Sequence, residues 1–271
     1  MPELPEVETT RRGIAPHVEG FEIARVAVRN THLRLPVPHD LATKLTGRCV
    51  AHIERRGKYL LFDMGTGTVI LHLGMSGSLR IVSPNAPPGR HDHLDIEFVN
   101  GVCLRLCDPR RFGLVLWTRG APLAHPLLRE LGPEPLEDIF DGEYLFASTR
   151  RRRVAIKQLL MNARIVVGVG NIYVNEALFL AGVHPLRAAG RIGRARCIRL
   201  AEAVRAVLRA AITQGGTTLR DFYYGDNRPG YFGQNLRVYG RAGEPCPTCG
   251  AAIRQLTQGQ RSTYYCPRCQ H

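Results

Sequence analysis

The sequence predicts an α+β protein in which an N-terminal helix and a β-rich half precede a helical half. Short runs of branched and aromatic residues fill the first half, and helical periodicity begins after residue 150. Four paired cysteines close the chain. We therefore expect a β-sandwich domain at residues 1–130, a linker at 131–149, a helical domain at 150–235 and a cysteine-rich module at 236–271.

The N-terminal helix is expected to begin at Pro5, because proline lacks the N–H that the first turn of a helix leaves unsatisfied. Glu6 and Glu8 then fall in the first turn, where the helix dipole favours negative charge. Val7 and Ile14 are seven residues apart and can share a buried face.

The β-rich half is predicted from its alternating and apolar runs. Leu94–Phe98 and Val102–Leu106 alternate on either side of Asn100-Gly101, a strong hairpin signal. These runs favour a sandwich, with a barrel as the alternative. The other expected strands lie within 21–30, 48–56, 59–62, 69–73 and 114–117.

The helical half contains three periodic segments. Helices are expected at 150–161, at 171–180 and, as the longest, at 194–214. Residues 215–235 are rich in Gly, Thr, Tyr and Asn and are expected to form a loop.

The charge distribution points to a polyanionic partner. The 271 residues carry a net charge of +14. Residues 1–145 hold 17 Lys+Arg against 18 Asp+Glu, whereas residues 146–271 hold 20 against 5, a net of +15. Nucleic acid is the first candidate. Because neither a membrane-spanning run nor a signal peptide is evident, we expect a cytoplasmic protein without a membrane partner.

The N-terminus contains the functional groups that Schiff-base chemistry requires. After removal of Met1, Pro2 presents a secondary amine, and an N-terminal amine has a pKa of about 8. Glu3 is adjacent and can transfer protons, and Glu6 lies about one turn away. The alternative is a capped helix with solvated acids.

Cys246-x2-Cys249 and Cys266-x2-Cys269 are separated by 16 residues. This spacing is typical of a zinc ribbon, and four thiolates leave no open position on the metal. We expect one structural Zn²⁺, with disulfide pairing as the alternative.

Gly168-Val169-Gly170-Asn171 lacks the third glycine of a dinucleotide-binding loop and does not follow a clear strand. A glycine turn with Asn171 opening the second helix instead suits a backbone phosphate. A simple helix cap is the alternative.

Met1-Pro-Glu-Leu-Pro-Glu-Val-Glu-Thr9 resembles the N-terminus of the bacterial formamidopyrimidine-DNA glycosylases. The resemblance covers nearly the whole chain, with five separated motifs in family order. It implies a bifunctional DNA glycosylase and AP lyase of base excision repair that removes 8-oxoguanine and formamidopyrimidines by β,δ-elimination. Pro2 is the implied nucleophile, Glu3 the acid and base, and Glu6 their support.

The resemblance also implies how DNA is held. Lys58 and Arg261 would bind phosphates at the lesion, and Asn171 would grip DNA from a helix–two-turns–helix element. Met75, Arg110 and Phe112 would wedge into the base stack, whereas without the resemblance Met75 and Phe112 would be taken as core residues. We also expect DNA contacts from His91, Arg152 and Tyr173.

Residues 217–233 resemble the family's lesion-capping loop. One departure is that Asn162 and Arg164 stand where many members have Asp and Lys. The expected protein is a nucleoid-associated bacterial monomer that binds damaged double-stranded DNA. Two alternatives are a non-catalytic zinc-ribbon DNA-binding protein and an endonuclease VIII-type glycosylase for oxidised pyrimidines.

Overall fold

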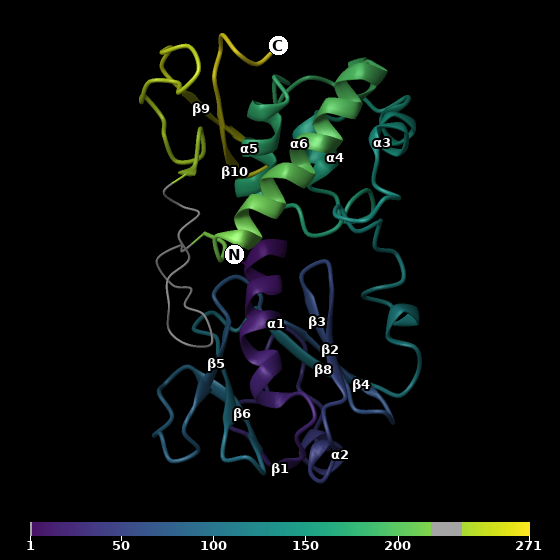
Figure 1. The fold of residues 1–271 in the computed structure, drawn as a ribbon, viewed down its shortest axis with the longest axis vertical. Coiled ribbons are helices and arrows are strands. Elements are labelled where there is room, and N and C mark those ends of the chain that lie inside the picture. Colours follow the sequence, from purple (N-terminus) through teal and green to yellow (C-terminus); the bar gives the residue numbers. More distant parts are fainter. Residues whose placement is uncertain (1, 218–234) are drawn as a thin grey trace. The chain divides into compact units, whose positions relative to one another are not determined.

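A computed structural model describes residues 2–217 and 235–271. Two compact units contain the described chain: residues 2–129 with Gly215–Thr217, and Glu130–Gln214 with 235–271 (Figure 1). Each unit has its own hydrophobic core. The mixture of helices and sheets confirms the predicted α+β class. Over these two described ranges, every helix is too short or too polar to cross a membrane.

Two four-stranded antiparallel sheets form the first unit and confirm the predicted sandwich (Figure 1). Their facing sides supply one continuous apolar core. The first sheet has the order β1-β6-β7-β5, with bounds Ile23–Val28, Asp92–Phe98, Cys103–Cys107 and Ser78–Val82. The second has the order β2-β3-β4-β8, with bounds His52–Arg56, Tyr59–Asp63, Thr68–His72 and Leu114–Thr118.

Helix α1 (Leu4–Val18) lies against strands of both sheets, namely β2, β3 and β5 (Figure 1). Val7 and Ile14 are buried in the core, as their spacing predicts. Glu3 is the N-cap residue, so Pro5 is the second helical residue and not the first. The packing of α1 fixes the two residues that precede it beside the sandwich.

The hairpin at Asn100-Gly101 is confirmed, since β6 and β7 pair across it. Gly101 has φ 79°, a conformation that glycine adopts without steric cost. The Asn100 side chain accepts a hydrogen bond from the N–H of Val102. Strand β5 and the short helix α2 (Leu41–Leu45) were not predicted. A 3₁₀ turn, η1 (Pro122–Ala124), follows β8.

The second unit is helical and carries a C-terminal hairpin. Helices α5 (Asn171–Leu180) and α6 (Arg194–Thr213) lie where the sequence predicts them. The remaining elements are α3 (Gly142–Thr149), α4 (Ile156–Leu160), η2 (Ala189–Arg191), β9 (Arg254–Gln258) and β10 (Arg261–Tyr265). Strand β10 packs on α5.

The predicted helix at 150–161 is wrong in its first half, because only residues 156–160 are helical. Arg151 has φ 59°, which ends regular structure there. The Arg150 guanidinium donates instead to the carbonyls of Gly190 and Ile192, at 3.1 and 2.5 Å. Helix α3 was also unexpected, in a segment read as a linker. Of the predicted loop at 217–233, only Thr217 belongs to the described residues.

Candidate active site

Pro2, Glu3 and Glu6 are brought together at the start of α1, and all three are buried. The two oxygens of the Glu6 carboxylate have different partners. Oε2 accepts a hydrogen bond from the N–H of Glu3 at 2.9 Å, and Oε1 accepts one from the N–H of Thr217 at 2.8 Å. The alternative of solvated acids is therefore wrong, although the helix is indeed capped. A buried, fixed carboxylate beside residue 2 is suited to proton transfer.

Glu8 is a third buried acid, and it ties α1 to the β2–β3 turn. Its carboxylate accepts hydrogen bonds from Arg11, Arg12 and Arg55, at 2.7–3.2 Å. Burial would raise the pKa of Glu8, but these arginines lower it to about 2. Arg55 also donates to the Gly57 carbonyl at 3.1 Å. Glu8 thus fixes the turn that presents Lys58.

Lys58 lies half-buried at that turn, close to a histidine that the sequence analysis did not single out. Burial, together with the positive charges of Lys58 and Arg34, lowers the pKa of His72 from 6.5 to about 4. The neutral ring packs against Tyr59 with its centroid 4.8 Å away. Its Nδ1 accepts a hydrogen bond from the N–H of Gly74 at 2.9 Å. What marks His72 as a candidate site residue is its half-buried position beside a lysine, and that position is known only once the fold is known.

Met75 and Phe112 stand at the tips of two adjacent loops and are 41% and 44% exposed. The interpretation of both as core residues is therefore wrong. The guanidinium carbon of Arg110 lies 5.0 Å from the centroid of the Phe112 ring. Arg111 has φ 58°, a strained conformation for a non-glycine residue. The loops place an apolar pair and a cation together on the surface of the first unit.

In the second unit, Asn171 and Arg261 are brought together through Ser262. The Nδ2 of Asn171 donates to the Ser262 carbonyl at 3.1 Å, and Arg261, the preceding residue, is exposed. Lys157 donates to the same carbonyl at 3.0 Å and to the Thr263 hydroxyl at 2.7 Å. Sequence reasoning named Lys157 only as one of three lysines that could serve as a nucleophile and did not predict these contacts, which lie more than 100 residues away in sequence.

The other expected residues are placed as follows. His91 is half-buried just before β6, and Arg152 is exposed. Tyr173 is 1% exposed and packs in the core of the second unit, so its contact with DNA stays a prediction. Arg164, at a position where many family members have lysine, forms an ion pair with Glu130.

The four cysteines of the C-terminal hairpin form a metal site. Their sulfur atoms all lie within 4.8 Å of one another, with Cys246–Cys269 at 3.9 Å and Cys249–Cys266 at 3.5 Å. Zn–S bonds of about 2.3 Å in a tetrahedron separate the sulfurs by about 3.8 Å. The four thiols are free, so the disulfide alternative is wrong. Geometry and donor chemistry fit one structural zinc.

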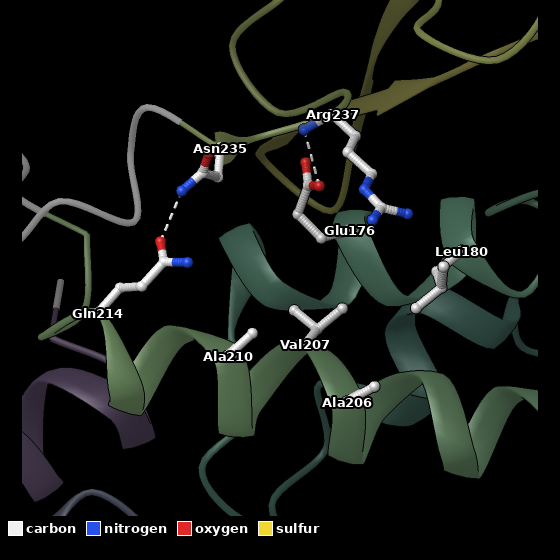
Figure 2. A pocket seen from close by; sticks show the side chains of 8 residues that line it. All are labelled: Glu176, Leu180, Ala206, Val207, Ala210, Gln214, Asn235 and Arg237. Carbon is white, nitrogen blue, oxygen red and sulfur yellow. Dashed lines mark hydrogen bonds between the residues drawn. The ribbon is translucent and has the colours of Figure 1, made fainter.

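A pocket of about 480 Å³ lies in the second unit between α5, α6 and residues 235–237. Figure 2 shows the Glu176 carboxylate pointing at the backbone of Arg237, and Asn235 facing Gln214. Glu176 accepts three backbone hydrogen bonds, from Arg237, Val238 and Tyr239, at 2.9–3.0 Å. This carboxylate therefore fixes the segment before the zinc site to α5.

Comparison with known families accounts for most of the chain. Residues 1–115 match the formamidopyrimidine-DNA glycosylase N-terminal domain. Residues 131–223 match the formamidopyrimidine-DNA glycosylase H2TH domain. Residues 243–271 match the zinc finger found in FPG and IleRS.

Relatives match over their full length. The formamidopyrimidine-DNA glycosylases of Thioalkalivibrio sulfidiphilus and Nitrosococcus oceani are 62% and 60% identical, with 100% of each chain covered. The crystal structure of the MutM (Fpg) protein of Thermus thermophilus is 38% identical, with a TM-score of 0.89 over 99% of this chain and 98% of that one. The Lactococcus lactis Fpg in complex with abasic-site DNA is 34% identical, with a TM-score of 0.91 over 99% of both chains.

The two-sheet unit, the helical unit and the four-cysteine finger define a DNA glycosylase of base excision repair. The family models and the full-length identities above 55% show which family of DNA glycosylases this is. The chain belongs to the formamidopyrimidine-DNA glycosylase family.

Proposed function

We propose that this protein excises oxidised purines from duplex DNA and cleaves the abasic site, with Pro2 as the nucleophile. The observation that carries the proposal is the buried pair Glu3 and Glu6 beside residue 2. Such a site excludes water and holds carboxylates next to the residue that carries a free amine once Met1 is removed. N-terminal amines have a reference pKa of about 8, so a useful fraction of such amines is neutral near pH 7.

The reaction follows from the chemistry of a secondary amine. The Pro2 nitrogen bonds to C1′ as the C1′–N bond to the purine breaks, and the base leaves with the electron pair and takes up a proton from solvent. Glu3 accepts the ammonium proton and returns it to O4′, which opens the sugar ring and leaves a C1′=N⁺ iminium. Glu6, held by the N–H groups of Glu3 and Thr217, keeps Glu3 in place.

Strand cleavage uses the acidity that the iminium confers on C2′. Loss of the C2′ proton gives an enamine that expels the 3′-phosphate, and a second elimination expels the 5′-phosphate. Water then hydrolyses the iminium and regenerates the Pro2 amine. No redox or nucleotide cofactor enters this sequence of steps.

Phosphates are held from both units. Lys58 offers a cation from the turn that Glu8 and Arg55 stabilise. In the second unit, the amide nitrogen of Asn171 has two N–H groups, of which one binds Ser262, and the exposed Arg261 is adjacent. Zinc has a structural role here, because it holds the hairpin that carries Arg261.

Extrusion of the damaged base is assigned to the two exposed loops of the first unit. Met75 and Phe112 would fill the vacated stack, and Arg110 would bond the orphaned partner base. His91, Arg152 and Tyr173 are assigned further DNA contacts. We infer that the protein acts as a monomer on damaged duplex in the bacterial cytoplasm, where it associates with the nucleoid.

A panel of defined lesions tests the proposal. Duplexes carrying 8-oxoguanine, formamidopyrimidine, thymine glycol or uracil are incubated with wild-type protein and with Glu3→Gln. The two purine lesions are expected to be excised by the wild type, whereas Glu3→Gln should lose base release. Preferential excision of thymine glycol would instead indicate an endonuclease VIII-type enzyme, and binding without cleavage of any duplex would indicate a non-catalytic DNA-binding protein.

A further inference from the structure

Asp108 follows β7 directly and lies between the two exposed loops, with a side chain that is 0% exposed. Both carboxylate oxygens are occupied. Oδ1 accepts a hydrogen bond from the Ser76 hydroxyl at 2.9 Å, in the loop that carries Met75. Oδ2 accepts one from the N–H of Gly113 at 2.7 Å, at the end of the loop that carries Phe112. One buried carboxylate therefore joins both loops.

The backbone of Asp108 makes a third connection. Its N–H donates to the carbonyl of His91 at 2.9 Å. Its carbonyl oxygen accepts a hydrogen bond from the Nε2 of the buried His93 at 2.8 Å. Residue 108 thus lies at the junction of three segments, and each of them presents a residue that the proposed function places on DNA.

Close backbone contact between the loops shows that they are a single packed unit. A Cβ on Gly74 would meet the Gly113 nitrogen at 2.4 Å, and one on Gly113 would meet the His72 carbonyl oxygen at 2.9 Å and the Asp108 Oδ2 at 3.0 Å. Neither position leaves room for a side chain. Ser76 adds a further link, because its Oγ accepts a hydrogen bond from the N–H of Arg110 at 3.3 Å.

We propose that Asp108 and Ser76 are positioning residues that hold the wedge of Met75, Arg110 and Phe112 in its inserting geometry before DNA arrives. This inference rests on the proposed function, since it assigns a role to groups that touch no DNA themselves. A preformed wedge inserts without first losing the conformational freedom of two separate loops. The hydrogen bonds to a buried carboxylate are strong enough to set that geometry, because charge assistance roughly doubles their strength.

Ser76→Ala is the main test, because it removes the hydroxyl that bonds Asp108 and the Arg110 N–H but leaves the Asp108–Gly113 bond intact. Ser78→Ala is the matched control, since Ser78 is a buried serine two residues further along, on β5. Single-turnover excision of 8-oxoguanine from duplex and cleavage of a preformed abasic site are measured for both variants. Fluorescence of a 2-aminopurine next to the lesion reports base extrusion without requiring chemistry, and thermal unfolding checks the fold.

Ser76→Ala is expected to slow excision and 2-aminopurine extrusion about tenfold, in line with the loss of a hydrogen bond to a charged group. Cleavage of the preformed abasic site should stay within about twofold of wild type, as should every rate of Ser78→Ala. Asp108→Asn should show a larger loss of the same pattern, because it removes the negative charge that strengthens the hydrogen bonds to both Ser76 and Gly113. Ser76→Thr, which keeps the hydroxyl, should restore extrusion.

Equal losses of Ser76→Ala on the two substrates, or unchanged extrusion, would overturn the positioning role. A wild-type protein that cleaves neither substrate would refute the proposed function separately. In that event the extrusion signal still decides the role of Ser76, because it is read before any bond breaks.

Discussion

The Glu6 carboxylate accepts a 2.8 Å hydrogen bond from the backbone N–H of Thr217, which lies 211 residues further along the chain. Its other oxygen accepts the N–H of Glu3. Glu3, the neighbour of Pro2, and Thr217 are therefore held by one side chain. The start of α1 is fixed by a partner that the local sequence cannot reveal.

Glu6→Gln should destabilise this arrangement, because the amide NH₂ replaces one acceptor and then faces a backbone N–H. Loss of a hydrogen bond to a buried charged group costs about 1.5–3 kcal/mol. The melting temperature and the single-turnover rate of base release should both fall. Glu54→Gln, at an exposed carboxylate on β2, is the control and should change neither. A Glu6→Gln variant with an unchanged rate of base release would contradict the role of Glu6 in positioning Glu3.

Removal of zinc should unfold the C-terminal finger and abolish DNA binding, while the sandwich stays folded. Structural zinc in finger peptides supplies about 10–16 kcal/mol of apparent binding free energy, and the few apolar residues that pack around the four cysteines cannot replace it. Cys266→Ser and chelation are compared by circular dichroism and by DNA binding. Full DNA affinity after verified zinc removal would contradict the prediction.

Phe112→Ala should slow excision from duplex more than cleavage of a preformed abasic site, because extruding a stacked base costs a few kcal/mol. The ring is 44% exposed, so the free energy of unfolding should change little. Val99→Ala, at a valine that is 61% exposed in the same unit, is the control and should leave both rates unchanged. Equal losses on the two substrates would favour a packing role for Phe112.

His72 should make the first unit less stable in mild acid. Its pKa is lowered from 6.5 to about 4 in the folded state, so between these values the unfolded chain binds a proton that the folded chain does not. Stability therefore falls as pH decreases through this window, by about 2 kcal/mol between about pH 7 and pH 5. His72→Asn keeps an acceptor for the Gly74 N–H and should lose this part of the dependence. Denaturant titrations of both proteins at the two pH values provide the measurement, and parallel slopes would refute the assignment to His72.

Local signals were enough for much of the fold. The Asn100-Gly101 hairpin and helix α5 follow from turn chemistry and periodicity within a few residues. The 150–155 segment was read as helix because its apolar spacing is helical, but Arg150 is held by carbonyls 40 and 42 residues away. Tertiary contacts override local preference there.

The sequence predicted those residues of the candidate site that belong to recognisable motifs. The four cysteines follow from their spacing alone, whereas residue type only suggested Pro2 and Glu3 and the family resemblance assigned their roles. Asp108 and Lys157 could not be found in this way, because an aspartate before proline reads as a turn and a lysine between apolar residues reads as a solvated helix face. Asp108 binds Ser76 and Lys157 binds Ser262, and both partners are distant in sequence.

The nucleophile is the central claim, and borohydride trapping on damaged duplex tests it most directly. With Met1 attached, Pro2 is an amide nitrogen without a usable lone pair, so only protein that has lost Met1 should react. Wild type should give a stable covalent adduct that peptide mapping assigns to residue 2, Pro2→Gly should retain some trapping through its amine, and an added N-terminal tag should eliminate it. An adduct mapped to Lys58 or Lys157, or robust cleavage by protein shown to retain Met1, would contradict the account.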